Sequence, residues 1–170
     1  MWITNAKTQD GIIMKDFDIE ERASRAVRNF EAGYNCAQSV FLAYSDVFEL
    51  DMELAKKMSV SFGGGVGRMR EICGTVSAMA MLAGFKYPVL DINDQEARTK
   101  NYAIVQRMAD LFKEKHGTVI CRRLLPPEDA AATTPAPSAR TKEYYQKRPC
   151  GKFIEDAARI AGRMLKGELD

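Results

Sequence analysis

The sequence predicts an all-α protein, a compact multi-helix bundle of about six to seven helices with a glycine-rich loop before the central helix. Apolar residues recur at helical spacing between capping residues and glycine or proline stops, and no segment alternates apolar and polar residues as a half-buried strand does. With 170 residues, of which 46% are hydrophobic, the chain is long enough for one domain with a substantial core.

The first two helices follow closely on one another. Asp18 and Glu21 have the spacing of a capping box, so the first helix is expected to begin after Asp18 and to end at Gly33. Asn35 is the expected cap of the second helix, which carries Cys36 in its first turn.

Three helices are expected in the middle of the chain. One follows Asp51. The next is the strongly apolar central helix, which Gly84 and Pro88 are expected to end. A long amphipathic helix then begins at Asn93 or Asp94 and stops at Gly117.

Two helices complete the bundle. A short one is expected after a cap at Thr118 and carries Cys121, and the last runs over residues 151–166, directly after Cys150. The stretch 126–139, PPEDAAATTPAPSA, has the composition of a flexible loop.

The domain organisation follows from these segments. Residues 1–17 have weak periodicity and are expected to form a partly ordered N-terminal arm. Residues 18–170 are expected to form a single α-helical domain that contains the flexible Pro/Ala-rich loop at 126–139.

Composition limits the partners. The net charge of +2 and the mixing of basic with acidic residues give no stripe for nucleic acid. No segment has the roughly 18 apolar residues of a membrane span. No basic segment followed by an apolar core begins the chain, so we expect no secretory signal and a cytoplasmic location. We expect a redox partner whose identity the sequence does not give. Whether the chain forms a homodimer stays undecided.

The cysteines carry the main functional signal. Each stands at or near an expected helix start, where the partial positive charge of the helix stabilises anions and can lower the pKa of a thiol. Basic residues near them act in the same direction: Arg68 and Arg70 near Cys73, Arg122 and Arg123 beside Cys121, and Arg148 and Lys152 around Cys150. The candidate catalytic residues are Cys36, Cys73, Cys121 and Cys150.

Two alternatives to thiol chemistry stay open. The same residues, Cys36, Cys73, Cys121 and Cys150, supply enough ligands for a four-cysteine metal site, so the cofactor is undetermined between none, an iron–sulfur cluster and zinc, although no Cys-x-x-Cys pair is present. Free cysteine is also often a small buried hydrophobic residue, which would make the chain a structural bundle with inert thiols.

The glycine loop does not match a nucleotide motif. It lacks a preceding strand, a complete Gly-x-Gly-x-x-Gly pattern and a Gly-Lys-Ser/Thr ending. We expect it to allow close backbone packing beside the helix that follows, and an anion near its arginines is an open alternative. The candidate binding residues are Gly63, Gly64, Gly65, Gly67, Arg68 and Arg70.

A set of short motifs resembles one known family over about residues 20 to 165. The motifs are Asn35-Cys36-Ala37-Gln38, the FGGGVGRM run at 62–69, Cys73-Gly74, Cys121-Arg122-x-Leu124-Leu125, and Cys150 before the last helix. The family is the redox-active one named for its C_GCAxxG_C_C cysteine pattern. Thr75 and Ala78 stand here where that pattern has Ala and its second Gly.

The resemblance implies redox activity that depends on the four cysteines, and it supports the thiol and cluster hypotheses together. We therefore expect thiol–disulfide or electron-transfer chemistry, in which the chain is an oxidoreductase or an electron carrier. Cys73 is the expected attacking thiolate, with Cys36 as its partner, and Cys121 with Cys150 form the expected second pair. Four cysteines allow three pairings, so this one is an expectation.

Overall fold

The fold is all-α, as the sequence predicted. The computed structural model describes residues 7, 8, 10, 11 and 13–169, and within them it has nine α-helices, two short 3-10 helices and no strand. The α-helices are α1 (Ile19–Glu31), α2 (Cys36–Tyr44), α3 (Met52–Ser59), α4 (Gly74–Lys86), α5 (Gln95–His116), α6 (Cys121–Leu124), α7 (Pro127–Ala131), α8 (Lys142–Lys147) and α9 (Cys150–Leu165). The 3-10 helices are η1 (Ser45–Phe48) and η2 (Val60–Phe62).

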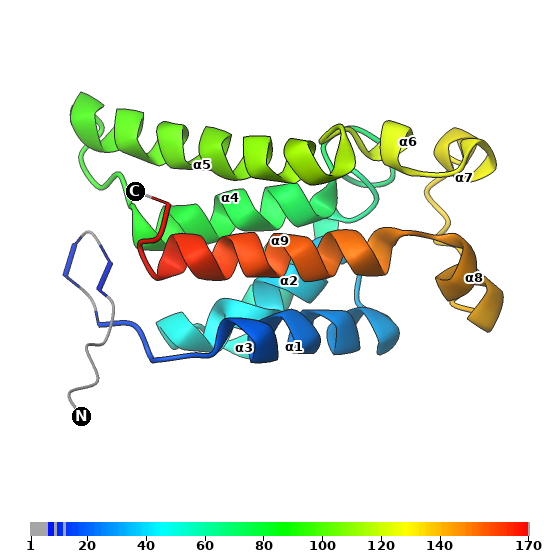
Figure 1. Cartoon of the computed structure of the whole chain (residues 1–170), viewed down its shortest axis with the longest axis horizontal. Coiled ribbons are helices and arrows are strands. Elements are labelled where there is room, and N and C mark those ends of the chain that lie inside the picture. The colour runs from blue at the N-terminus through cyan, green and yellow to red at the C-terminus, as the bar shows by residue number, and fades with distance from the viewer. Residues whose placement is uncertain (1–6, 9, 12, 170) are drawn as a thin grey trace.

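The long helices lie side by side along the molecule, and the three short helices α6, α7 and α8 gather at one end (Figure 1). Helix α9 packs against α1, α4 and α5, while α2 packs against α1 and α4. The largest fully buried apolar side chains of this core are Tyr44, Phe41, Phe112, Met14, Met79, Leu82, Met108, Ile154, Met164, Leu165 and Val40. The hydrophobic core therefore occupies the middle of the bundle, away from the end where the short helices gather.

Local capping explains where the long helices begin. The side chains of Asp18, Asn35, Asp51 and Asp94 each accept a hydrogen bond from a backbone N–H three residues later. Such caps stabilise a helix by about 1 kcal/mol each. The expected starts are confirmed, with Asp94 rather than Asn93 as the cap of α5, and Gly117 ends that helix in the left-handed conformation.

The start of α6 differs from the prediction. Thr118 is not its cap: the Thr118 hydroxyl accepts the N–H of Ile120, and the helix begins only at Cys121. The reason is a tertiary contact, because Ile120 forms an isolated antiparallel bridge with Ile72 and is therefore extended.

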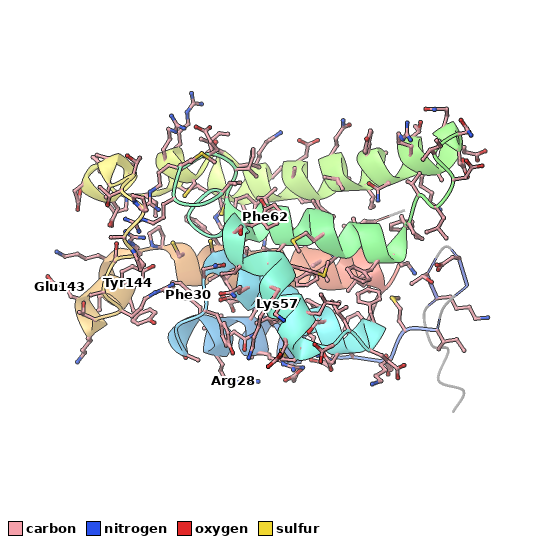
Figure 2. The ribbon with its side chains drawn as sticks, turned by 180° about the vertical axis from the view of Figure 1, so that it is seen from behind. Arg28, Phe30, Lys57, Phe62, Glu143 and Tyr144 are labelled. Carbon is pink, nitrogen blue, oxygen red and sulfur yellow. The ribbon has the colours of Figure 1, made fainter. Side chains whose placement is uncertain are left out.

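The segment between α6 and α9 contains two short helices. Helix α7 lies within the stretch expected to be a flexible loop, and α8, capped by Thr141, was not among the expected helices. Tyr144 of α8 lies beside Phe30 of α1, with ring centroids 6.2 Å apart (Figure 2). This contact holds α8 against the first helix.

The expected N-terminal arm falls partly outside the described residues, which omit 1–6, 9 and 12. Of its described part, Met14 and Phe17 are buried, and the Phe17 ring meets the Tyr44 ring edge-on at 5.4 Å. None of the helices in the described part of the chain is both long and apolar enough to span a membrane.

Candidate functional site

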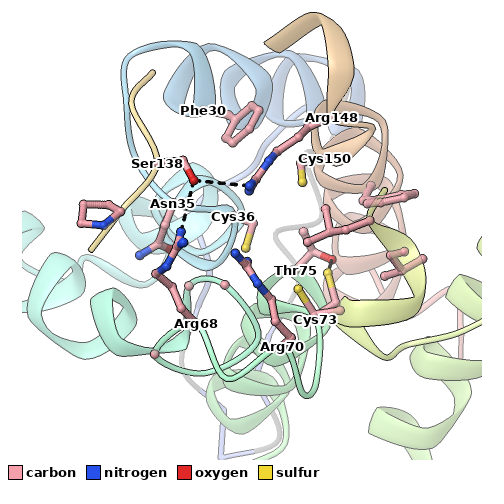
Figure 3. Close-up of a pocket in the computed structure, with 18 of the residues that line it drawn as sticks. Phe30, Asn35, Cys36, Arg68, Arg70, Cys73, Thr75, Ser138, Arg148 and Cys150 are labelled. Atoms are coloured by element: carbon pink, nitrogen blue, oxygen red, sulfur yellow. Dashed lines mark hydrogen bonds between the residues drawn. The ribbon is translucent and has the colours of Figure 1, made fainter. Parts of the chain in front are cut away.

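A pocket of about 380 Å³ lies at the end of the bundle where α2, α4 and α9 begin. All four cysteines line it, together with four arginines: Arg68, Arg70, Arg140 and Arg148. The rest of the wall is largely apolar and includes Phe30, Leu124, Leu125, Pro135, Pro137, Tyr144 and Phe153. Figure 3 shows Cys36, Cys73 and Cys150 around the same space as the guanidinium groups.

Every cysteine stands at a helix start, as the sequence predicted. Cys36 is the first residue of α2, Cys121 of α6 and Cys150 of α9, while Cys73 is the N-cap of α4. Residues as far apart in sequence as 36 and 150 therefore meet because several helices begin at the same end of the bundle.

The residue after Cys73 sets how closely two helices approach. A β-carbon built on Gly74 would lie 2.6 Å from Cys36 Sγ and 2.7 Å from the carbonyl oxygen of Phe62. Such separations are shorter than van der Waals contact permits, so the thiol of Cys36 occupies the space that a side chain at position 74 would need. The Cys73-Gly74 pair thus brings the first residue of α2 against the first turn of α4.

A short backbone bridge fixes Cys121 relative to Cys73. The Cys73 N–H donates to the Val119 carbonyl at 2.8 Å, and the Cys121 N–H donates to the Glu71 carbonyl at 2.6 Å. These bonds flank the Ile72–Ile120 bridge, so the loop before α4 and the start of α6 are held together.

The glycine-rich loop makes a left-handed turn. The φ angle is positive at five consecutive residues, 64 to 68, and again at Arg70. Each residue with a side chain in this conformation costs about 1–2 kcal/mol, so Val66 (φ 59°), Arg68 (φ 66°) and Arg70 (φ 62°) are strained. Backbone strain of this kind is common at functional sites. Here the strained turn positions Arg68 and Arg70 at the pocket.

The arginines reach the pocket from different segments. Arg70 is only 2% exposed, and its Nη2 donates to the Ala132 carbonyl at 2.8 Å. Arg68 donates through Nε to the Thr134 carbonyl at 2.7 Å. Arg148 forms an ion pair with Asp129.

The pKa values correct one expectation. The sequence predicted lowered thiol pKa values, which is wrong for Cys73, Cys121 and Cys150. Burial raises the pKa of all three, to about 12 at Cys150, and the neighbouring thiol of Cys36 acts in the same direction. Arg70 lowers the pKa of Cys121 and Arg148 lowers that of Cys150, but each effect is smaller than burial.

Cys73 differs from the expectation in its surroundings as well. It is 5% exposed, and its Sγ lies 3.1 Å from the hydroxyl of Thr75, which lowers the pKa of the thiol against the larger effect of burial. Arg70 was expected to stabilise the thiolate of Cys73. Its positive charge instead lowers the pKa of Cys121.

The described cysteines are free thiols in this structure. No group of three or more His, Cys, Asp or Glu side chains within the described residues lies close enough together to hold a metal ion. We therefore derive no chemical step through an iron–sulfur or zinc centre.

Sequence reasoning missed part of the site. Arg140 and Tyr144 were not among the predicted residues, and Arg148 was noted only as a neighbour of Cys150. The Tyr144 ring contacts both Arg140 and Arg148, with each guanidinium carbon 4.6 Å from its centroid. Arg140 precedes the Thr141 cap of α8 and Arg148 follows the helix, so spacing along one helix face could not have identified all three.

Fold and site together define a small α-helical protein with a four-thiol, arginine-lined pocket. The family model described as "Putative redox-active protein (C_GCAxxG_C_C)" matches residues 34–164, and the chain belongs to this family. A comparison with curated proteins and one with solved structures each found no match.

Proposed function

We propose that the protein carries out thiol–disulfide exchange in this pocket. The observation that supports it is the convergence of all four cysteines on one cavity, although they come from separate helices and loops. Membership of a redox-active family adds support. The co-reactant is an oxidised partner that contains a disulfide.

The exchange balances with two thiols of the protein. A thiolate attacks one sulfur of the partner disulfide, forms a mixed disulfide and releases the first partner thiolate, which takes up a proton. A second protein thiol, once deprotonated, attacks the mixed disulfide and releases the second partner thiol. The protein gains one internal disulfide, and the partner disulfide is reduced to two thiols by two electrons.

Cys36 and Cys73 are the proposed first pair. We assign the attack to Cys36, because it is only half-buried while burial disfavours the thiolate of Cys73. The sulfur of Cys36 lies against Gly74, the residue next to Cys73, and the Cys36 thiol raises the pKa of Cys73, so the two thiols are neighbours. Cys121 and Cys150 remain the proposed second pair.

The test uses reduced protein and 2-hydroxyethyl disulfide, a small neutral disulfide. We expect two protein thiols to be lost for each disulfide reduced, with a Cys36–Cys73 bond found by peptide mass spectrometry. A Cys73→Ser variant should accumulate the mixed disulfide on Cys36, and a Cys36→Ser variant should form none on Cys73. The two variants are matched controls, because each removes one sulfur of the same pair.

Other outcomes would replace the proposal. Stoichiometric iron with visible absorption after anaerobic purification would favour a cluster, and stoichiometric zinc would favour a structural metal site. An unchanged thiol content after treatment with the disulfide would favour a helical bundle with inert cysteines.

A further inference from the structure

We propose that the arginine side of the pocket binds the oxyanion group of a small ligand, such as a carboxylate, a phosphate or a sulfonate. The group would lie between the guanidinium groups of Arg68, Arg70 and Arg148, beside the thiols. Three features support this site: its charge, one unsatisfied donor and the shape of the pocket.

The pocket has an excess of positive charge. Four arginines line it, and none of the described residues in its wall is an aspartate or a glutamate. Of these arginines only Arg148 has a carboxylate partner within the described chain, namely Asp129. Burial and the positive charges of Arg70 and Arg148 lower the pKa of Arg68, so an anion beside Arg68 would offset an unfavourable buried charge.

Arg70 provides an unsatisfied donor. A guanidinium group is charged at every physiological pH, and burying it without an anion is unfavourable. Arg70 is almost fully buried, yet its Nε–H has no hydrogen-bond partner among the residues that the structure describes. Figure 3 shows its guanidinium group extending from the glycine loop toward Cys36, into the pocket.

The other two guanidinium groups meet at a single neutral hydroxyl. Arg68 and Arg148 each donate to Ser138 Oγ, both at 3.4 Å, as the dashed lines in Figure 3 show. Arg68 also donates to the Thr134 and Ala132 carbonyls, and Arg148 to Tyr144 and Asp129. Each arginine carries five N–H donors, so both still have donors for a group with several oxygens. Oxyanions match this geometry, because guanidinium binds carboxylate and phosphate through paired hydrogen bonds.

The pocket's size and walls define the rest of the ligand. Its volume lies in the range of small-molecule sites, about 300–1,000 Å³, and its aromatic and proline side chains would contact an uncharged portion. The ligand class is therefore a small organic anion rather than a bare ion. That such an anion is the substrate of the thiols rests on the proposed function, whereas its binding does not.

Two alkylating reagents test the charge preference. Iodoacetate and iodoacetamide have the same leaving group and similar size, but only the first carries a carboxylate. We expect the ratio of their rates at Cys36 and Cys150 to exceed that of free cysteine by about tenfold, because a charged cleft raises the local concentration of an opposite charge. Peptide mass spectrometry of the reduced protein assigns the rate to each cysteine.

Arginine variants connect the preference to the pocket. Arg70→Gln and Arg68→Gln should each lower the ratio toward that of free cysteine. Arg68 is only half-buried, so its variant remains informative if Arg70→Gln does not fold. Arg123→Gln is the matched control, because Arg123 lies two residues after Cys121 but is exposed and outside the pocket wall, and it should keep the full ratio.

A competition experiment completes the test. Inorganic phosphate should slow alkylation by iodoacetate more than sodium chloride of equal ionic strength does. A ratio equal to that of free cysteine, or a ratio unchanged in both pocket variants, would overturn the proposal. These readouts do not involve 2-hydroxyethyl disulfide, so failure here and failure of disulfide exchange are separate results.

Discussion

The sulfur of Cys36 lies so close to the Cα of Gly74 that a β-carbon there would be 2.6 Å from it. Gly74 is the first residue of α4, and Cys36 is the first residue of α2, so this contact joins two helix N-termini. Glycine at position 74 is therefore a steric requirement of the site.

Gly74→Ala should destabilise the protein and displace Cys36. Overpacking of this kind costs about 1–3 kcal/mol, and urea unfolding would measure the loss. Gly84→Ala in the same helix is the control, because a β-carbon there meets nothing within 4 Å. It should be neutral or stabilising by up to about 1 kcal/mol. Equal effects of the two substitutions would contradict the steric explanation.

Gly65→Ala should lower the free energy of unfolding more than Gly67→Ala does. Both glycines have positive φ, so each substitution carries a conformational cost of about 1–2 kcal/mol. Only at Gly65 would the new β-carbon also clash, at 2.7 Å from the β-carbon of Cys121, whereas Gly67 has open space. Unfolding free energies of the two variants give the comparison, and indistinguishable values would show that Cys121 does not pack closely there.

The free energy of unfolding should fall as the pH rises above about 8.5, the ordinary pKa of a thiol. Cys150 keeps its proton in the folded state up to a pKa of about 12, while the unfolded chain releases that proton earlier. The folded state then binds more protons, so this contribution to stability is lost between these two values. Burial raises the pKa of Cys73 and Tyr44 in the same direction.

Denaturant unfolding between about pH 8 and pH 10.5, a window chosen from these pKa values, would measure this slope. A Cys150→Ser variant should show a shallower decrease, because the serine hydroxyl does not titrate in this range. Parallel curves for the variant and the natural chain would mean that the thiol of Cys150 is not desolvated.

Thr75→Ala should make Cys73 less reactive. The Thr75 hydroxyl lies 3.1 Å from Cys73 Sγ and lowers the pKa of the thiol, so its removal should raise that pKa further. A hydrogen bond worth about 1 kcal/mol corresponds to labelling about fivefold slower at a fixed pH. Thr75→Ser keeps the hydroxyl and should retain the natural rate of iodoacetamide labelling at Cys73. A loss of rate in both variants would indicate altered packing instead.

The helix starts could be predicted because their causes are local. The caps at Asp18, Asn35 and Asp51 each bond to an N–H only three residues away, so the sequence contains the whole interaction. Among the cysteines only Cys36 follows such a cap, because α4, α6 and α9 begin without a side-chain cap.

The thiol pKa values could not be predicted in this way. A helix N-terminus is visible in the sequence, but the burial of Cys73 depends on how the surrounding segments pack, and burial is the larger effect. The same limit applies to the start of α6, where pairing of Ile120 with Ile72 keeps the chain extended. Contacts between segments distant in sequence determine both the thiol pKa values and the start of α6.

The left-handed turn was also beyond sequence reasoning. Glycine at 64, 65 and 67 permits positive φ, but nothing local requires Val66 and Arg68 to share that conformation. Packing of Gly65 against Cys121 and the bond from the Glu71 N–H to the Gly65 carbonyl hold the turn in place. The arginines reach the pocket as a result of these longer-range contacts.

The cysteines occupy only the opening positions of their helices, while the later turns of α2, α4 and α9 form the hydrophobic core. The first positions of these helices thus form the pocket, and their later turns stabilise the fold. A substitution near the start of one of these helices can therefore change the chemistry of the pocket while the core stays the same. Thr75, which replaces the family's alanine beside Cys73, would be one such adjustment.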